Sequence, residues 1–311
     1  MKILVALGGN ALLKRGEPMD ASTQFRNVQH AATALVQLIG AGHELIITHG
    51  NGPQVGLLAL QAEAGPDDGR YPLDILGAES QGMIGYMLEQ AMRNLLPKGT
   101  ILATVLTQTR VDATDVAFSK PTKPIGPVYD EATARTLERE RGWTCVRDGA
   151  AWRRAVASPE PLDIIELPAI RLLQRAGAIV ICAGGGGIPV VARSNGHLAG
   201  IEAVIDKDKA SQMLAQALSV DLLLMLTDVD AVYVSYGEND ARSIVRMGPD
   251  PDFANALDAG SMGPKVEAAT RFAIDTGRDA RIGRTEDALA IVQGMAGTIV
   301  QALDVGTEYR V

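Results

Sequence analysis

Ile3-Leu4-Val5-Ala6-Leu7-Gly8-Gly9 is a short apolar run that ends directly in glycines, and it sets the pattern for the rest of the chain. An apolar run of this length predicts a strand buried on both faces, and the glycines predict a tight turn after it. Similar runs recur further along the chain, at Glu44–Thr48, Ile101–Thr107, Ile179–Ala183 and Leu222–Thr227. We expect all of them to be strands of one sheet.

Longer stretches with helical spacing lie between these strands. They are Thr23–Ile39, Gln54–Ala64, Leu73–Leu96, Ile164–Ala176 and Lys207–Leu218. Strands that are buried on both faces and separated by helices indicate βαβ units and a mainly parallel sheet. The sequence therefore predicts an α/β protein.

Residues 112–157 interrupt this alternation. Ser119-Lys120-Pro121-Thr122-Lys123-Pro124-Ile125-Gly126-Pro127 is too rich in proline for a helix or a central strand. A charged helical stretch follows at Glu131–Arg141, with strand-like pieces around Thr144–Val146 and Arg153–Val156. We predict one domain over residues 1–311 with an inserted small lobe at about 112–157. The alternative is a surface excursion without function, although long irregular segments are more often functional.

Glycine turns follow three of the expected strands, at Gly8-Gly9-Asn10, His49-Gly50-Asn51-Gly52 and Gly184-Gly185-Gly186-Gly187. In a parallel sheet such turns gather at the carboxyl ends of the strands, where open α/β folds bind ligands. Their N–H groups and the positive ends of the following helices favour anions. Three turns together favour a phosphate or carboxylate site over plain connections between strand and helix.

Sequence motifs for several other kinds of functional site are absent. There is no P-loop and no Rossmann fingerprint, and no Cys or His pair has the spacing of zinc ligands. The four histidines leave little material for a Ser-His-Asp arrangement, and we expect His49 to support its glycine turn and not to act as a catalytic base.

The amino-acid composition argues against several other classes of protein. The 311 residues carry a formal net charge of −8, which argues against a broad nucleic-acid surface. Two cysteines are too few for a disulfide framework, and we expect Cys182 to be a core thiol. No signal peptide and no apolar run of roughly 18 residues is found, so we expect a soluble cytoplasmic protein without a membrane partner.

Lysine is scarce, with 8 residues against 21 arginines, and most of it lies in unusual segments. A lysine ammonium is a compact charge that can follow a phosphoryl group as it moves. For Lys123, Lys207 and Lys265, which stand among Pro, Asp and Gly, we prefer a functional role over a solvated surface position. For Lys120 and Lys209 we prefer the solvated surface position.

Acidic residues flank Lys207 on both sides. Asp206 and Asp208 can hold this lysine charged or lie near a magnesium ion, and Asp206 can equally be the N-cap of a helix. Farther on, Thr227, Asp228 and Tyr233 follow the Leu222–Thr227 strand. They can line a nucleotide pocket, although a hairpin alone would explain the aspartates.

Taken in order, these segments resemble the carbamate kinase family of the amino-acid-kinase superfamily, almost from end to end. The resemblance rests on Ala6–Leu12, Thr48–Gly56, Ser80–Tyr86, Pro121–Pro127, Gly184–Pro189, Glu202–Asp208 and Gly260–Glu267. It implies a three-layer αβα sandwich, a homodimer, and reversible phosphoryl transfer between ATP and carbamate, with Mg²⁺ on the nucleotide. In arginine catabolism that reaction runs from carbamoyl phosphate and ADP toward ATP, carbamate and then ammonia and CO₂.

The resemblance also implies roles for individual residues. The carbamoyl and phosphoryl groups would be held by Gly8, Gly9, Asn10, Gly50, Asn51 and Gly52. The catalytic residues would be Lys123, Lys207 and Asp206. The nucleotide would contact Lys207, Asp208, Thr227, Asp228, Tyr233, Met262, Lys265, Gly185 and Gly186. Protein ligands to the metal are not implied.

One position departs from other members of the superfamily, many of which carry a lysine on the first strand just before the glycines. Here that place is Ala6, and the resemblance makes Lys123 of the proline-rich segment the expected substitute. This pair speaks against a kinase for another small carboxylate, which is one alternative. A second alternative is a nucleotide-binding paralogue without turnover, which the three lysines disfavour.

The stretch Leu73–Leu96 carries more apolar surface than one sheet face needs, in Leu76, Met83, Ile84, Met87, Leu88 and Met92, with Gly77, Gly82 and Gly85 allowing close approach. We expect part of it in a two-fold dimer interface. The alternative is a helix buried within one chain.

Overall fold

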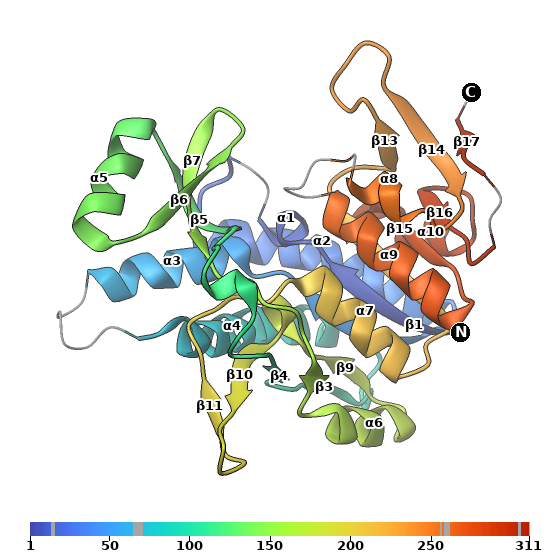
Figure 1. Cartoon of the computed structure of the whole chain (residues 1–311). Helices are drawn as coiled ribbons and strands as arrows, with labels where there is room; N and C mark the ends of the chain where they lie inside the picture. Colours follow the sequence, from blue (N-terminus) through green and yellow to red (C-terminus); the bar gives the residue numbers. More distant parts are fainter. Residues whose placement is uncertain (14–15, 65–70, 256, 258–261, 304–305, 311) are drawn as a thin grey trace.

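A sheet of ten strands runs through the part of the chain that this computed structural model describes, residues 1–13, 16–64, 71–255, 257, 262–303 and 306–310 (Figure 1). Its central strands are parallel neighbours, in the order β15 (Ala280–Arg284), β12 (Leu222–Thr227), β1 (Lys2–Leu7), β2 (Glu44–His49), β9 (Ile179–Ile181) and β3 (Leu102–Thr104). Beyond β15 the sheet continues through β16 (Thr298–Val300), β14 (Arg242–Met247) and β13 (Val232–Val234), and β17 (Glu308–Tyr309) pairs with β14.

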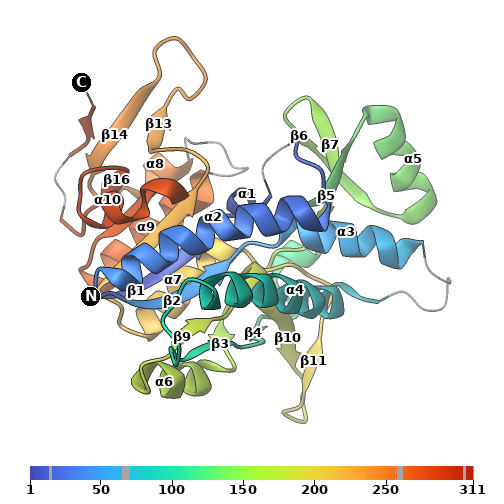
Figure 2. The same ribbon diagram turned by 180° about the vertical axis from the view of Figure 1, so that it is seen from behind.

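Helices cover both faces of this sheet. On one face α2 (Ala21–Gly40), α4 (Leu73–Arg93) and α10 (Ala288–Val292) close a core that includes Ile3, Val5 and Leu7 (Figure 2). On the other, α6 (Leu167–Arg175), α7 (Lys207–Ala217) and α9 (Gly263–Thr276) close a core around Leu4, Met225 and Phe272. Because successive residues of β1 enter different cores, its apolar run is continuous. The predicted α/β sandwich with a mainly parallel sheet is confirmed.

A separate small sheet lies within residues 112–157, which we call the small lobe. After η1 (Val116–Phe118), its strands β5 (Lys123–Tyr129), β7 (Ala151–Val156) and β6 (Thr144–Asp148) pair antiparallel in that order beside α5 (Glu131–Arg141) (Figure 1). β5 is an edge strand, where its prolines remove no hydrogen bond that a central strand would need. A third sheet joins β11 (Leu198–Gly200), β10 (Ile188–Ala192), β4 (Gln108–Arg110) and β8 (Asp163–Ile164).

Two sequence predictions were wrong in extent. The strand expected at Ile101–Thr107 ends at Thr104, because the backbone N–H of Thr107 donates to the Gln81 side chain and the chain leaves the sheet. The helix expected from Ile164 begins at Leu167, because Ile164 pairs with β4 and Pro168 occupies the first helical turn.

The apolar side of α4 is used mainly inside the chain. Of the residues named for a dimer interface, Leu76, Ile84, Met87, Leu88 and Met92 are buried. Gly85 allows α4 to approach β3, since a Cβ there would lie 2.3 Å from the Thr104 methyl. Ile75 and Tyr86 remain exposed on the same helix. The alternative of a helix buried within one chain therefore explains most of this apolar surface.

The remaining short elements are α1 (Gly9–Leu12), α3 (Gly52–Glu63), η2 (Gly184–Gly186), α8 (Pro251–Asn255) and η3 (Thr285–Asp287). Among the described residues, no helix has both the length and the apolar character needed to cross a lipid bilayer.

Candidate active site

The three glycine turns meet at the carboxyl ends of neighbouring strands, β1, β2 and β9. A Cβ on Gly50 would lie 2.7 Å from the Gly9 amide nitrogen, and one on Gly185 would lie 2.2 Å from Asn51 Nδ2. Gly185 also has φ +64°, a left-handed conformation that favours glycine. These positions need glycine because the turns touch one another.

Close contact, and not N–H donation, is the role of several of these glycines. The Gly8 N–H donates to Leu226 O at 2.7 Å, the Gly50 N–H to Leu7 O at 2.9 Å, and the Gly186 N–H to Ala183 O at 3.0 Å. Anion donors are therefore better sought at Gly9, the first residue of α1, and at Gly52, where α3 begins. The Asn51 side chain does not cap α3 but donates to Ser80 Oγ at 2.8 Å, which leaves the first N–H groups of α3 to a ligand.

Asn10 lies in α1 by its backbone, and its side chain is outside the described part of the structure.

The His49 side chain packs against two of the glycine turns. Its ring is buried against Gly184, where a Cβ would lie 2.4 Å from the imidazole, and Nδ1 donates to Gly50 O at 3.1 Å. Burial lowers the pKa of His49 to about 4, so the ring is neutral near pH 7. A buried neutral ring with this contact fits the structural role that the sequence suggested.

The charged part of the site is built on the first turn of α7. Asp206 is the N-cap of this helix, as one sequence interpretation predicted, and its Oδ1 accepts from the N–H groups of Asp208 at 2.8 Å and Lys209 at 3.4 Å. A Cβ on Gly186 would lie 2.8 Å from the carbonyl oxygen of Ile205, so this turn begins beside the third glycine turn.

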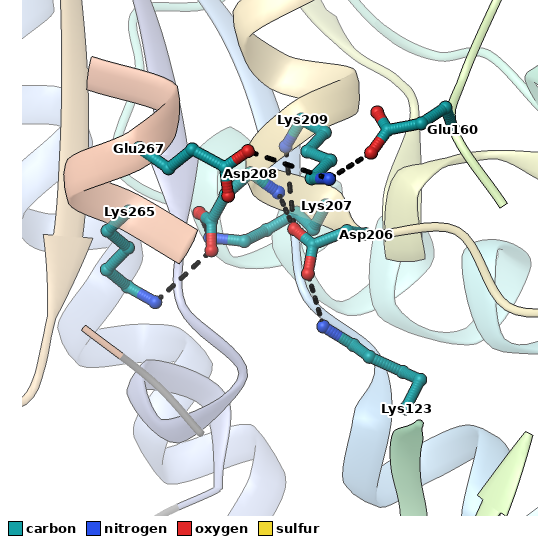
Figure 3. Close-up of polar contacts among 8 residues, drawn as sticks. All are labelled: Lys123, Glu160, Asp206, Lys207, Asp208, Lys209, Lys265 and Glu267. Atoms are coloured by element: carbon teal, nitrogen blue, oxygen red, sulfur yellow. Dashed lines mark hydrogen bonds and ion pairs between the residues drawn. The ribbon is translucent and has the colours of Figure 1, made fainter. Parts of the chain in front are cut away.

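Three lysines and two aspartates converge there from three segments of the chain (Figure 3). The ammonium of Lys123, on β5, donates to Asp206 Oδ2. Lys265, on α9, lies 3.4 Å from Asp208 Oδ2, and Lys207 Nζ lies 2.7 Å from Asp208 Oδ1. Three positive and two negative charges leave the cluster with a net charge of +1.

Lys207 carries donors that the described residues leave unused. Its Nζ is sealed from solvent, and although it lies within ion-pair distance of Asp208, no described residue accepts a hydrogen bond from it with good geometry. Burial lowers the pKa of Lys207, Asp208 counteracts this effect, and Lys265 lowers the pKa further. A buried ammonium with unused donors suits an anionic ligand that arrives with several acceptor oxygens.

Asp206, Lys123 and Asp208 are held ionised by neighbouring charges. Burial favours neutral Asp206, but Lys123, the Asp208 N–H and Lys207 together outweigh it and keep the pKa of this carboxyl well below its usual range. Burial likewise opposes the charge on Lys123, but Asp206 and Asp208 together outweigh it and raise the lysine pKa. Asp208 is held the same way, since Lys207 and Lys265 overcome its burial and lower its pKa.

Lys123 reaches the cluster because the small lobe is seated closely on α3. A Cβ on Gly56 would lie only 2.0 Å from Gly126 Cα, so helix and strand cross almost in backbone contact. Ala6, where many superfamily members carry the first-strand lysine, is fully buried between Thr48 and Met225 on the neighbouring strands. The cation on this side of the site therefore comes from β5.

The remaining predicted nucleotide residues lie at the end of β12, on β13 and at the start of α9. Thr227 Cα lies 3.6 Å from a Cβ built on Gly8, and its Oγ1 donates to Asp228 at 3.0 Å. Met262 is the N-cap of the helix that carries Lys265. Tyr233 donates to Asp230 at 3.0 Å, and no hydrogen bond or ion pair within the described residues joins it to the lysine cluster. Gly260 and Ser261, part of the same motif, lie outside the described residues.

Two features were missed from sequence. Lys209 is not a solvated surface lysine: it donates to Glu160 and lies 3.7 Å from Glu267, with 30% of its side chain exposed. Gln81 joins α4 to the third glycine turn through Thr107, whose hydroxyl accepts from the Ala183 N–H at 2.9 Å. The Ser80-Gln81 pair belongs to the Ser80–Tyr86 segment that resembles the carbamate kinases, and this resemblance is the sequence signal that could have indicated its role.

Fold and site together place the chain in a known class: it belongs to the amino acid kinase family, whose model matches residues 1–284. A UMP kinase from Bacillus anthracis, 16% identical with a TM-score of 0.57, shares the fold. Within the family the chain falls among the carbamate kinases. It is 51% identical over 304 residues to the carbamate kinase of Rhizobium meliloti, covering 97% of this chain and 94% of the relative.

Other carbamate kinases are similar to this chain in sequence and in structure. The chain is 49% identical to that of Haemophilus influenzae over 309 residues, covering 99% of each chain. Among solved structures, the carbamate kinase from Giardia lamblia bound to AMP-PNP is 39% identical, with a TM-score of 0.87 over 96% of this chain and 98% of that one.

Proposed function

We propose that this chain transfers a phosphoryl group reversibly between carbamoyl phosphate and ADP, giving carbamate and ATP. The observation that carries the proposal is the sealed Lys207 ammonium, whose donors are unused among the described residues, inside a cluster of net charge +1. Phosphoryl transfer asks the protein mainly for positioning and for positive charge around the moving group. The cluster supplies that charge beside the glycine turns.

The reaction needs no proton transfer by the protein. An oxygen of the ADP β-phosphate attacks phosphorus, the bond between phosphorus and the carbamoyl oxygen breaks, and carbamate leaves with the electron pair. In the reverse direction carbamate is already an anion near neutral pH. This fits a site in which His49 is buried and neutral.

Each part of the site has a place in this proposal. The N-terminal turn of α3 and Gly9 would bind the carbamoyl and phosphoryl oxygens. Lys207 and Lys265 would contact the nucleotide phosphates, and Asp206 and Asp208 would hold the lysines charged and aimed. Lys123 would leave Asp206 to follow the transferred phosphoryl.

Magnesium would enter bound to the nucleotide. The described residues contain no group of three or more His, Cys, Asp or Glu side chains placed to hold a metal ion. The bound ion would neutralise phosphate charge and orient the β- and γ-oxygens. We assign no protein ligand to it.

Three further elements belong to the proposal. Residues 1–311 would act as one domain whose small lobe delivers Lys123. Two chains would pair through the exposed Ile75 and Tyr86 of α4, beside β3 at the edge of the main sheet. The enzyme would work in the cytoplasm, where ATP and ADP are available, and the direction toward ATP would serve arginine breakdown.

A coupled assay tests the function. Purified protein is supplied with carbamoyl phosphate, ADP and Mg²⁺, and ATP formation is followed through hexokinase and glucose-6-phosphate dehydrogenase. We expect ATP formation that requires both substrates. In the reverse direction, carbamate should be phosphorylated far faster than acetate or N-acetylglutamate. No ATP formation, or preference for another carboxylate, would refute the proposal.

A further inference from the structure

We propose that Lys209 is a positioning residue for Lys123, acting through Glu160 to keep the small lobe docked on α7 while Lys123 changes partners. The inference rests on the proposed function, in which Lys123 follows the phosphoryl group. Lys209 occupies the first turn of α7, one helical turn from Asp206. Figure 3 shows its ammonium directed away from the lysine cluster, between Glu160 and Glu267.

The Lys209 contacts join segments that are distant in sequence. Glu160 lies on the segment that returns from the small lobe to the main body, and Glu267 lies on α9. Burial opposes the charge on Lys209, but the hydrogen bond that Lys209 donates to Glu160, together with the negative charges of Glu160, Glu267 and Asp206, outweighs burial and raises the lysine pKa. A partly exposed ion pair of this kind contributes little to stability by itself. Its location, where the segment returning from the small lobe meets α7 and α9, points to a different use.

Glu160 is linked to Lys123 by backbone pairing. Four residues before Glu160, Val156 is the direct antiparallel partner of Lys123 in the β5–β7 ladder. The Glu160 N–H also donates to Asp115 Oδ2 at 3.0 Å, near the start of the small lobe. Holding Glu160 therefore restrains the start of the small lobe, the segment that returns from it and the strand that carries Lys123.

The Lys209–Glu160 pair would keep the small lobe on α7 when the Lys123–Asp206 contact is broken. In the structure, the contact between the Lys123 ammonium and Asp206 ties the lobe to α7. If that were the main tie, moving Lys123 to a phosphoryl oxygen would release the lobe and misplace the lysine. The Lys209–Glu160 pair is made by other side chains on the same helical turn, so it persists when Lys123 lets go of Asp206.

The test uses turnover with carbamoyl phosphate and ADP. Lys209→Met and Glu160→Gln should each lower kcat about tenfold and change KM for ADP less than about twofold, since misplacing a catalytic group slightly can cost up to about 10² in rate. Lys209→Arg should stay within about threefold of wild type. Arg271→Met is the matched control, because it removes an exposed pair with Asp275, 3.8 Å apart on α9, and should leave kcat unchanged.

The direction of the rate changes and their additivity distinguish a positioning role of Lys209 from a purely electrostatic one. If Lys209 acted by its charge alone, Lys209→Met and Glu160→Gln would shift the rate in opposite directions, because one removes a positive and the other a negative charge. Positioning predicts the same direction for both. In a Lys123→Ala background, Lys209→Met should have no further effect, since residues acting through one another are not additive. Multiplied effects, or opposite signs, would overturn the proposal.

Hydrogen exchange supplies a readout that does not depend on turnover. Lys209→Met should increase deuterium uptake in β5 and β7 and leave β1 and β12 unchanged, whereas Arg271→Met should match wild type. Unchanged uptake in β5 and β7 would overturn the inference even if the enzyme is active. Should the wild type form no ATP, the proposed function fails while this exchange experiment still decides whether Lys209 docks the lobe.

Discussion

Lys123→Ala is the substitution whose effect follows most directly from the geometry of the site. It removes one of three cations from a cluster that also holds two carboxylates, so the net charge falls from +1 to 0. A unit charge about 4 Å from another contributes about 4 kcal/mol at an effective dielectric constant near 20. Loss of a single transition-state donor typically costs about 2.7–4 kcal/mol. We therefore expect kcat to fall roughly 100- to 1,000-fold.

Nucleotide binding should survive this change. Lys207 and Lys265 remain, and Asp206 keeps its two backbone hydrogen bonds from the start of α7. KM for ADP should change less than about threefold, and a thermal melt should show that the variant is folded. Lys120→Ala is the matched control, because it removes an exposed lysine from the same segment. Near-normal turnover in Lys123→Ala would refute the assignment of this lysine to the transferred phosphoryl.

Three further outcomes are expected. His49→Gln should change turnover less than about tenfold. As pH falls from about 6.5 toward 4, the unfolded chain binds a proton at His49 that the folded chain, with a His49 pKa of about 4, does not bind. The wild type should therefore lose stability relative to this variant over that pH range, which pH-dependent melts check. Gly56→Ala should lower kcat more than tenfold by displacing β5, whereas Gly40→Ala, with open space around it, should be silent in the same assay. Light scattering should give about 66 kDa, twice the 32.8 kDa chain, and a monomer would reject the dimer.

Sequence alone could predict the layers of the fold because buried positions require apolar residues. Strands enclosed on both faces, such as β1, must be apolar throughout, and the glycines after them are required where neighbouring turns touch. The N-cap role of Asp206 was also visible, since the residue type and the following helix are local features. Local features of this kind are what a single sequence records well.

Contacts between distant segments could not be predicted in the same way. Nothing near Lys209 indicates that Glu160 and Glu267 will flank it, so the sequence predicts a surface position for a lysine among polar residues at a helix start. The end of β3 depended on the Gln81 side chain, which takes the Thr107 N–H from another helix. The apolar face of α4 could not reveal whether its partner would be the same chain or a second one.

The role of Lys207 is tested by the rate of ATP formation in Lys207→Met compared with wild type, with ADP affinity measured alongside. This sealed ammonium, with its donors unused among the described residues, is placed to bind the phosphates. We expect a loss of at least about 100-fold in kcat/KM in a variant that still folds, because methionine fills the space without the charge. A folded Lys207→Met protein that retained turnover within about threefold of wild type would contradict this role for Lys207.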